Sequence, residues 1–500
     1  MIARPSILFD RDREWADLVS FVDHPTPRLR LGVVHGRRRF GKSFLLRRLT
    51  ETLGGCYHLA FEESARPALD RFAVTVGRLY EPVASLGFED WDQGLRSAVD
   101  LLGHRGSPQV LVIDEYPYLR AQSRELDSVI QSLIDAATDG AVGEGWTNPV
   151  SIILCGSALS VMTELLSGTA AMRGRASLDL SLEAFDYRQA REYWGIAEPA
   201  TAFGVHSVIG GAAGYRDLTA AVPNPERLDD LGDWVAQTVF NPSHALFRED
   251  EYLLREDPRI TKEAVYYSIM GAVAAGKSSQ SGIAAAIGKK AEEVTYHLNV
   301  LVSAGFVTRQ EDLLVARNPS YRVADPIVRF HQLITRRHQA LLEDRRAAGV
   351  WNIARDTHRS KVVGPHFEGI CRAWTARYAS GTTLGGDIGP VGTIQVNDPD
   401  TSQSFELHVA TATASTSNRK HKTLQVIGEA KGSARPCGIA DLDRLDRIRA
   451  LLAGRAGVTI AEGAKLLVFG FAGFDDELQT AAAARPDVEL VDLDRLYDGD

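Results

Sequence analysis

Gly36-Arg37-Arg38-Arg39-Phe40-Gly41-Lys42-Ser43 is a complete G-x-x-x-x-G-K-S motif, and its place in the chain decides the fold. An apolar run at residues 29–34 precedes it, and a helical pattern at residues 43–53 follows it. A strand, a glycine-containing loop and a helix in this order typically cradle phosphate groups. The context predicts that all eight residues bind a nucleotide, within an α/β domain built on a parallel sheet.

Each fixed position of the motif has a physical role. Gly36 and Gly41 give the backbone the freedom that a loop with inward-pointing N–H groups requires. The helix after the loop offers its positive N-terminal end to an anion. Lys42 is expected to reach the β- and γ-phosphates, and the Ser43 hydroxyl to take one position on Mg²⁺.

The three arginines at the variable positions of the loop allow two interpretations. Arg37, Arg38 and Arg39 either meet phosphate or a neighbouring subunit, or they remain in solvent. The sequence supports both equally.

Two further strand ends supply groups that phosphoryl transfer requires. Residues 110–115 form an apolar run that ends in Asp114 and Glu115. Asp114 is expected to hold the metal's water shell, and Glu115 to orient the attacking water. A third apolar run, residues 151–155, leads into Gly156 and Ser157. Ser157 is expected beside the γ-phosphate, so Lys42, Glu115 and Ser157 are candidate catalytic residues.

Composition places the chain among globular proteins. Its 500 residues exceed what one hydrophobic core fills, so several domains are expected. The 44% hydrophobic and 24% charged residues predict a soluble protein, and the net charge of −9 argues against a surface broadly adapted to nucleic acid. The four cysteines form no C-x-x-C pair, which predicts neither a zinc site nor disulfides. Without a long apolar stretch at residues 1–10 or any membrane-length run, we expect a cytoplasmic protein with no membrane partner.

The pattern of elements predicts four domains. Strand runs alternate with helical patterns over residues 1–200, the nucleotide-binding core. Residues 201–257 read as a small helical lid, and residues 258–325 follow the element order of a winged helix. Residues 326–500 form a C-terminal domain of mixed strands and helices.

The longer helix expected in the winged helix, residues 291–304, bears on DNA binding. Glu292 and Glu293 occupy its first turn, where a DNA reader would carry basic or amide side chains, so a protein contact is favoured. Lys289 and Lys290 keep DNA binding open as an alternative. The stripe expected to be buried consists of Val294, Leu298, Leu301 and Val302.

Together these features resemble a family of archaeal and bacterial predicted P-loop ATPases, AAA/STAND-like regulatory proteins with a lid, a winged helix and a restriction-endonuclease-like C-terminal domain. The resemblance covers nearly the whole chain. It rests on residues 9–14 (Phe-Asp-Arg-Asp-Arg-Glu), the loop at 36–43, residues 114–116, residues 155–157, Arg173-Gly174-Arg175 and residues 210–215. It implies ATP as the nucleotide, and the absence of a guanine-reading N-K-x-D tetrapeptide agrees. It also makes Arg175 a candidate contact to the γ-phosphate or between domains; the alternative is a surface arginine that pairs with a helix end.

The same resemblance implies a second metal site in the C-terminal domain, drawn from Glu368, Glu406, Glu429 and Lys431. Glu429 and Lys431 are two apart on an expected strand, so both project from one face. Carboxylates there would hold Mg²⁺ while the lysine polarises a water. The family usually has an Asp where this chain has His408, and imidazole is a poor Mg²⁺ ligand. The alternative is a scaffold that binds a partner without cleaving DNA.

Three functions follow from these observations. The first is a Mg²⁺-dependent ATPase whose nucleotide state drives a regulatory switch, with ATP and an unknown protein as partners. The second is an ATP-gated DNA-binding protein or nuclease that acts through the C-terminal domain. The third is a scaffold that binds nucleotide with negligible turnover. DNA and further copies of the chain complete the set of candidate partners.

Overall fold

The computed structural model describes all residues except 1, 81, 169, 316–318, 399–402 and 415–420. The chain divides into two compact units. The first unit consists of Met1–Phe185, Ala212–Tyr215 and Leu253–Thr261, and the second of Asp186–Gly211, Arg216–Tyr252 and Lys262–Asp500. The four-domain division drawn at residues 200, 257 and 325 stays a prediction.

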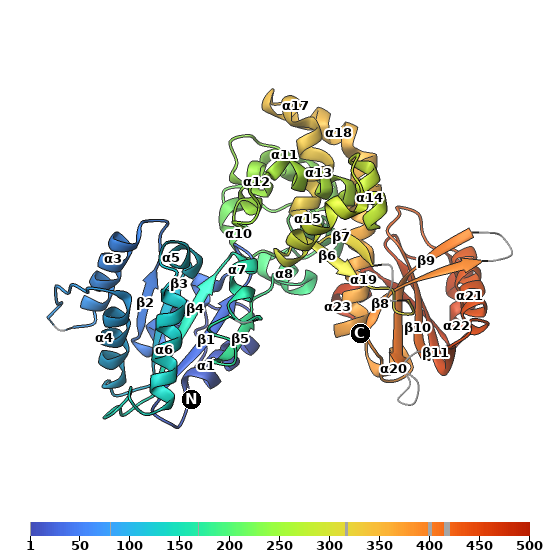
Figure 1. The fold of residues 1–500 in the computed structure, drawn as a ribbon. Coiled ribbons are helices and arrows are strands. Elements are labelled where there is room, and N and C mark those ends of the chain that lie inside the picture. Colours follow the sequence, from blue (N-terminus) through green and yellow to red (C-terminus); the bar gives the residue numbers. More distant parts are fainter. Residues whose placement is uncertain (1, 81, 169, 316–318, 399–402, 415–420) are drawn as a thin grey trace. The chain divides into compact units, whose positions relative to one another are not determined.

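A five-stranded sheet is the centre of the first unit (Figure 1), and every strand pairs in parallel, in the order β2-β3-β4-β1-β5. The strands are β1 Leu29–His35, β2 Cys56–Leu59, β3 Gln109–Asp114, β4 Val150–Gly156 and β5 Ala176–Ser181. The expected α/β fold with a parallel sheet is confirmed. Because β1 lies between β4 and β5, the loop after β1 opens at the sheet's carboxyl edge beside the ends of these two strands, and such sheets bind ligands at this edge.

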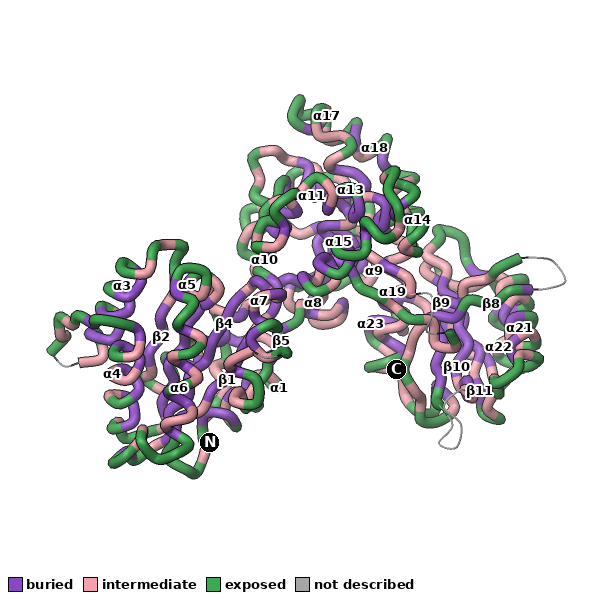
Figure 2. The backbone as a smooth tube through the Cα atoms, viewed as in Figure 1, coloured by how far each residue is buried: buried purple, intermediate pink, exposed green. Residues whose placement is uncertain are grey.

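Helices cover both faces of this sheet, and β3 and β4 are buried along their whole length (Figure 2). The helices are α1 Asp12–Val22, α2 Lys42–Leu53, α3 Ala65–Gly77, α4 Trp91–Gly103, α5 Tyr116–Gln122, α6 Leu126–Thr138 and α7 Leu159–Glu164. Successive strand residues face opposite sides. Leu111 and Ile113 join the core that contains α3, α4 and α6, whereas Val110 and Val112 join the core of α1 and α2.

Short helices form the start of the second unit and the region expected to be a lid. They are α8 Tyr187–Trp194, α9 Pro199–Ile209, α10 Gly214–Thr219, η1 Leu228–Asp230, α11 Leu231–Gln237, η2 Ala245–Arg248 and α12 Glu249–Leu254. The residues of α10 up to Tyr215, and those of α12 from Leu253, belong to the first unit.

Three helices and a two-stranded antiparallel sheet follow, in the element order expected of a winged helix. They are α13 Glu263–Ala274, α14 Gln280–Ala286, α15 Ala291–Ser303, β6 Val307–Gln310 and β7 Ser320–Val323. On α15, Val294, Leu298 and Leu301 are buried as expected, but Val302 is only half-buried and Val300 is buried instead. Val300 lies on a different side of the helix, so α15 is covered on more than the single stripe that its apolar spacing indicates.

The rest of the second unit ends in a mixed sheet of order β12-β11-β10-β9-β8, antiparallel from β8 to β10 and parallel from β10 to β12. Its strands are β8 Val391–Asp398, β9 Gln403–Ala414, β10 Lys422–Lys431, β11 Val458–Gly470 and β12 Val488–Asp492. The helices are α16 Pro326–Phe330, η3 His331–Thr335, η4 Arg336–His338, α17 Gln339–Glu343, α18 Ala347–Thr357, η5 His358–Val363, α19 Gly364–Arg377, α20 Gly381–Leu384, α21 Ile439–Ala453, α22 Asp476–Ala483 and α23 Leu493–Asp498. This α/β arrangement agrees with the expected fold class.

None of the helices that the structure describes combines the length and the apolar character that crossing a bilayer demands.

The core beneath α3 and α4 depends on one aromatic cluster, which yields a test of the fold. Phe72 is fully buried, and its ring contacts those of Phe88 and Trp91. We expect Phe72→Ala to lower the free energy of unfolding by about 3–5 kcal/mol because it removes buried contacts and leaves a cavity. Phe44→Ala, at a 42% exposed position, is the matched control and is expected to change stability by about 0.5 kcal/mol or less. Denaturant titration followed by circular dichroism measures both, and equal losses would contradict this packing.

Candidate nucleotide-binding site

The loop between β1 and α2 takes the backbone conformation that its glycines permit. Gly36 has a φ of +155°, and a Cβ there would collide with the carbonyl oxygen of Leu182. Gly41, the residue that precedes α2, has a φ of +94°. L side chains rarely adopt such angles. Both glycines of the motif are therefore required by the local backbone.

Two short segments from much later in the chain hold the variable part of this loop. The backbone of Arg39 is in the left-handed region, with a φ of 68°. Its carbonyl oxygen accepts a hydrogen bond of 2.9 Å from the backbone N–H of Gly214. Its guanidinium lies 6.0 Å from the ring centroid of Tyr215. Arg38 pairs with Glu256 at 2.9 Å. All of these residues belong to the first unit, so both segments contact the loop directly.

Arg11 braces the same loop from the N-terminal side. Its buried guanidinium donates to the carbonyl oxygens of Phe40, at 3.2 Å, and Glu183, at 2.8 Å. It also pairs with Glu14 at 2.8 Å and lies 4.4 Å from the ring centroid of Phe185. The Phe9–Glu14 signature thus contains the residue that ties the loop to the start of α1.

Lys42 points into the loop. Its side chain is buried, and Nζ donates to the carbonyl oxygen of Arg37 at 3.0 Å. This is the backbone acceptor that a phosphate oxygen would replace. Ser43 follows in the first turn of α2.

Asp114 ends β3 and is fully buried. One of its carboxylate oxygens accepts the backbone N–H of Glu115 at 3.0 Å, and the other accepts the hydroxyl of Tyr57. Carboxylate and hydroxyl oxygens are the ligands that Mg²⁺ prefers. Among the described residues no group of three or more His, Cys, Asp or Glu side chains forms a complete metal site. Asp114 and Ser43 fit an ion whose remaining ligands come from phosphate and water.

Glu115 is held in an unusual conformation at the start of α5. Its φ and ψ are 55° and 40°, in the left-handed region, and its carboxylate accepts the Ser157 hydroxyl at 3.3 Å. Burial raises the pKa of Glu115, the neighbouring charge of Asp114 raises it further, and Lys42 opposes both. Strained backbone and a perturbed carboxyl often coincide at functional sites. The structure brings together Lys42, Asp114, Glu115 and Ser157, although the chain separates them widely.

Arg175 lies on the surface in an ion pair. Its Nε and one terminal nitrogen bind the two carboxylate oxygens of Asp135 at 2.7 and 2.8 Å, and the other nitrogen donates to the carbonyl oxygen of Ala171 at 3.0 Å. This geometry is that of the surface pairing considered as its alternative role. A contact from Arg175 to nucleotide stays a prediction.

Sequence reasoning missed Tyr57 and Glu256. Tyr57 lies beside Asp114 because β2 and β3 pair with Leu59 opposite Asp114, a register that no local motif reveals. Glu256 belongs to the segment Leu253–Thr261, which contacts the loop although it lies far from it in the sequence. No sequence signal predicts this contact.

Residues expected at the second metal site lie in a network of ion pairs, and the metal site stays a prediction. Glu429 is 1% exposed on β10, and Lys431 lies 3.2 Å from its carboxylate, as two residues on one strand face permit. Arg444 and His408 lie 3.5 and 3.7 Å from the same carboxylate. Three potential cations therefore surround this one buried charge.

Arg322 from β7 forms ion pairs with the neighbouring carboxylates of the second unit. It pairs with Glu368 at 2.9 Å and with Glu406. His408 lies 3.7 Å from Glu368. Burial acts to raise the pKa of Glu368, but His408 and Arg322 outweigh it and hold this pKa below its usual value. Glu406 is thus engaged by the wing strand.

The raised pKa of Glu115 gives a pH-dependent prediction. The folded protein keeps a proton on Glu115 more readily than the unfolded chain, so this group's contribution to stability is present at low pH and is lost as pH rises through the folded pKa. We expect Glu115→Gln to raise the free energy of unfolding at pH 7, and the gain to vanish near pH 4. Denaturant titrations at both pH values test this, with exposed Glu125→Gln as the control. An equal gain at both pH values would refute it.

Comparison with known proteins found one family model and several proteins that resemble this chain. Residues 8–195 match the model of an ATPase domain found predominantly in Archaea. An uncharacterized protein of Methanocaldococcus jannaschii is 23% identical over 303 residues, which cover 60% of this chain and 62% of that protein, so less than two thirds of the relative is matched. A Walker-type ATPase of Pyrococcus abyssi is 20% identical and covers 66% of this chain and 97% of its own, with a TM-score of 0.49. The Aeropyrum pernix ORC2 protein, solved in ADPNP–ADP complexes, is 14% identical and covers 69% and 96%, with a TM-score of 0.43.

The family match covers the five-stranded sheet together with the loop, both carboxylates and Ser157. Residues 8–195 of this chain are therefore similar to the ATPase domain of this predominantly archaeal family.

Proposed function

We propose that this protein is a Mg²⁺-dependent ATPase that uses its nucleotide state as a regulatory switch. One observation carries the proposal: Lys42, Asp114, Glu115 and Ser157 converge at the carboxyl edge of the parallel sheet, beside a loop whose glycines leave its backbone accessible to phosphate. The match of residues 8–195 to an ATPase domain supports it.

The residues divide the work of hydrolysis among them. When nucleotide binds, the Lys42 ammonium leaves the carbonyl oxygen of Arg37 and binds the β- and γ-phosphates. The N–H groups of the loop bind the other phosphate oxygens. Asp114 and Ser43 would hold Mg²⁺, which neutralises phosphate charge when bound. Glu115 orients a water for in-line attack. Ser157, already bonded to Glu115, keeps that carboxylate directed into the site.

The contacts of Arg38 and Arg39 supply a route from nucleotide to the rest of the chain. Arg39 bonds to Gly214 and Arg38 pairs with Glu256. These partners lie in Ala212–Tyr215 and Leu253–Thr261, segments that continue in sequence directly into the second unit. When phosphate reshapes the loop, these two contacts are the first to change. A switch of this kind requires that nucleotide bind one loop conformation better than the other.

Lys42→Ala tests the nucleotide site. We expect the variant to lose phosphate release from Mg·ATP, and to lose the stabilisation of about 2.7 kcal/mol that a ligand gives at about one hundred times its dissociation constant. Lys277→Ala, an exposed lysine of the second unit, is the control and keeps both properties. Phosphate release and thermal unfolding with and without Mg·ATP measure the effects. Equal release by Lys42→Ala and the parent protein would exclude this mechanism.

The nuclease alternative has less support from the second unit. His408 stands where the resembling family has an acid, and Arg322 already pairs with Glu368 and Glu406. Among the described residues no cluster of His, Cys, Asp and Glu completes a metal site. The pairs of Arg322 with Glu368 and Glu406 are better suited to holding the wing strand than to hydrolysis.

A plasmid assay decides between these functions. We expect supercoiled plasmid to stay intact with Mg²⁺ or Mn²⁺, with and without ATP, because Arg322 and Lys431 neutralise the carboxylates that a metal would need. Nicking that requires metal and disappears in Lys431→Ala would establish the nuclease instead.

A further inference from the structure

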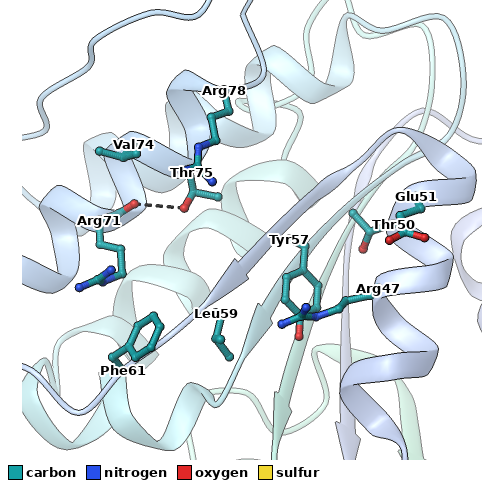
Figure 3. Close-up of a pocket in the computed structure, with 10 residues that line it drawn as sticks. All are labelled: Arg47, Thr50, Glu51, Tyr57, Leu59, Phe61, Arg71, Val74, Thr75 and Arg78. Atoms are coloured by element: carbon teal, nitrogen blue, oxygen red, sulfur yellow. Dashed lines mark hydrogen bonds between the residues drawn. The ribbon is translucent and has the colours of Figure 1, made fainter.

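We propose that a groove beside β2 binds an acidic, extended segment of a partner protein, and that its occupancy tightens the binding of Mg·ATP. The groove has a volume of about 410 Å³ and lies between α2 and α3, along the strand at the end of the sheet order (Figure 3). Its lining includes Arg47 and Glu51 of α2, Arg71 of α3, Arg78 directly after α3, Tyr57 of β2 and Phe61 beyond it. Only the coupling to nucleotide rests on the proposed function.

Charge favours a carboxylate-bearing occupant. Arg47 and Arg78 are exposed on opposite sides of the groove, and within the described part of the chain neither forms an ion pair. Arg71 is already paired with Glu63 by two bonds of 2.7 and 3.1 Å. Asp114 and Glu51 attract Arg47, but neither of these two guanidinium groups is held in an ion pair among the described residues. Both can therefore bind a carboxylate, which guanidinium does with two parallel hydrogen bonds.

Exposed apolar side chains favour a protein segment over a small inorganic anion. Phe61 is 45% exposed and Val74 is 55% exposed, both on the lining of the groove. The Arg71 guanidinium lies 4.5 Å from the ring centroid of Phe61. Aromatic and arginine side chains are enriched at protein interfaces. An extended segment would cover these groups with its own apolar side chains while its acids reach Arg47 and Arg78.

The charge pattern disfavours a nucleic-acid strand. Glu51 lies on the lining of the groove, where Arg48 pairs with it at 2.6 Å. A phosphate backbone carries a charge at every nucleotide, so part of it would lie beside this carboxylate. A peptide can place acids only where the arginines are.

A short chain of contacts connects the groove to the metal ligand. The Arg47 guanidinium lies 4.8 Å from the ring centroid of Tyr57, and the hydroxyl of Tyr57 donates to Asp114. The positive charge of Arg47 opposes a divalent cation at Asp114. An acidic segment would neutralise Arg47 and so favour that cation. Coupling between two ligands is reciprocal, so Mg·ATP must tighten binding of the segment by the same factor.

The first experiment tests the groove without nucleotide. Fluorescein-labelled peptides of alternating Asp and Leu, and of alternating Asn and Leu, are titrated with the full chain and followed by anisotropy. We expect the acidic peptide to bind at least about tenfold more tightly, and Arg78→Glu to weaken it on the order of tenfold. Arg13→Glu, an exposed arginine of α1, makes the same charge change away from the groove and is expected to have no effect.

The second experiment tests the coupling. We expect saturating Mg·ATP to increase the affinity of the protein for the acidic peptide about fivefold. Tyr57→Phe keeps the groove but removes the hydrogen bond to Asp114. We therefore expect this variant still to bind the peptide, while the ratio of its peptide affinities with and without Mg·ATP falls towards one. Lys42→Ala binds peptide and does not respond to ATP.

Equal affinity for both peptides, or an unaffected Arg78→Glu variant, would overturn the proposed groove. If the protein binds labelled oligo(dT) but no peptide, and Arg78→Glu abolishes this binding, the groove is a nucleic-acid site and the proposed peptide site is overturned. An unchanged peptide affinity in a protein that binds ATP would overturn the coupling. A wild-type protein that binds the acidic peptide but no ATP would refute the proposed function and leave the groove standing.

Discussion

Parallel pairing of β1 between β4 and β5 is the constraint on which the rest of the site depends. Because parallel strands end at the same edge of a sheet, the loop after β1 emerges next to Ser157 at the end of β4. The next strand, β3, then brings Asp114 and Glu115 to that edge. This strand order thus places a phosphate loop, two carboxylates and a hydroxyl at one edge of the sheet.

Holding this arrangement costs conformational energy, which other contacts offset. Arg39 and Glu115 are non-glycine residues in the left-handed region, where each costs on the order of 1–3 kcal/mol. Arg11 binds the loop backbone through Phe40, and Gly214 binds it through Arg39. The strain thus lies where phosphate is expected, and one of the contacts that hold it, from Gly214, comes from a segment that leads to the second unit. Such an arrangement suits a loop that responds to its ligand.

Sequence reasoning recovered the features that depend on local pattern. The strands at residues 29–35, 109–114 and 150–156 were legible as short apolar runs, and the phosphate loop as a motif. The position of Glu429 and Lys431 on one face of a strand followed from the two-residue period of a strand. Local pattern did not predict the contacts of Tyr57, Glu256 and Arg322. Each contact depends on strand register or on a segment that is distant in the sequence. Local pattern therefore predicts which groups exist, and tertiary pairing decides which of them meet.

Calorimetric titration of the full-length chain with Mg·ATP tests the central claim most directly, because it reports occupancy of the phosphate loop without requiring turnover. The account predicts a binding heat that saturates at one nucleotide per chain and that inorganic pyrophosphate competes away. A titration without heat at several temperatures, in protein whose circular dichroism shows it to be folded, would contradict the account.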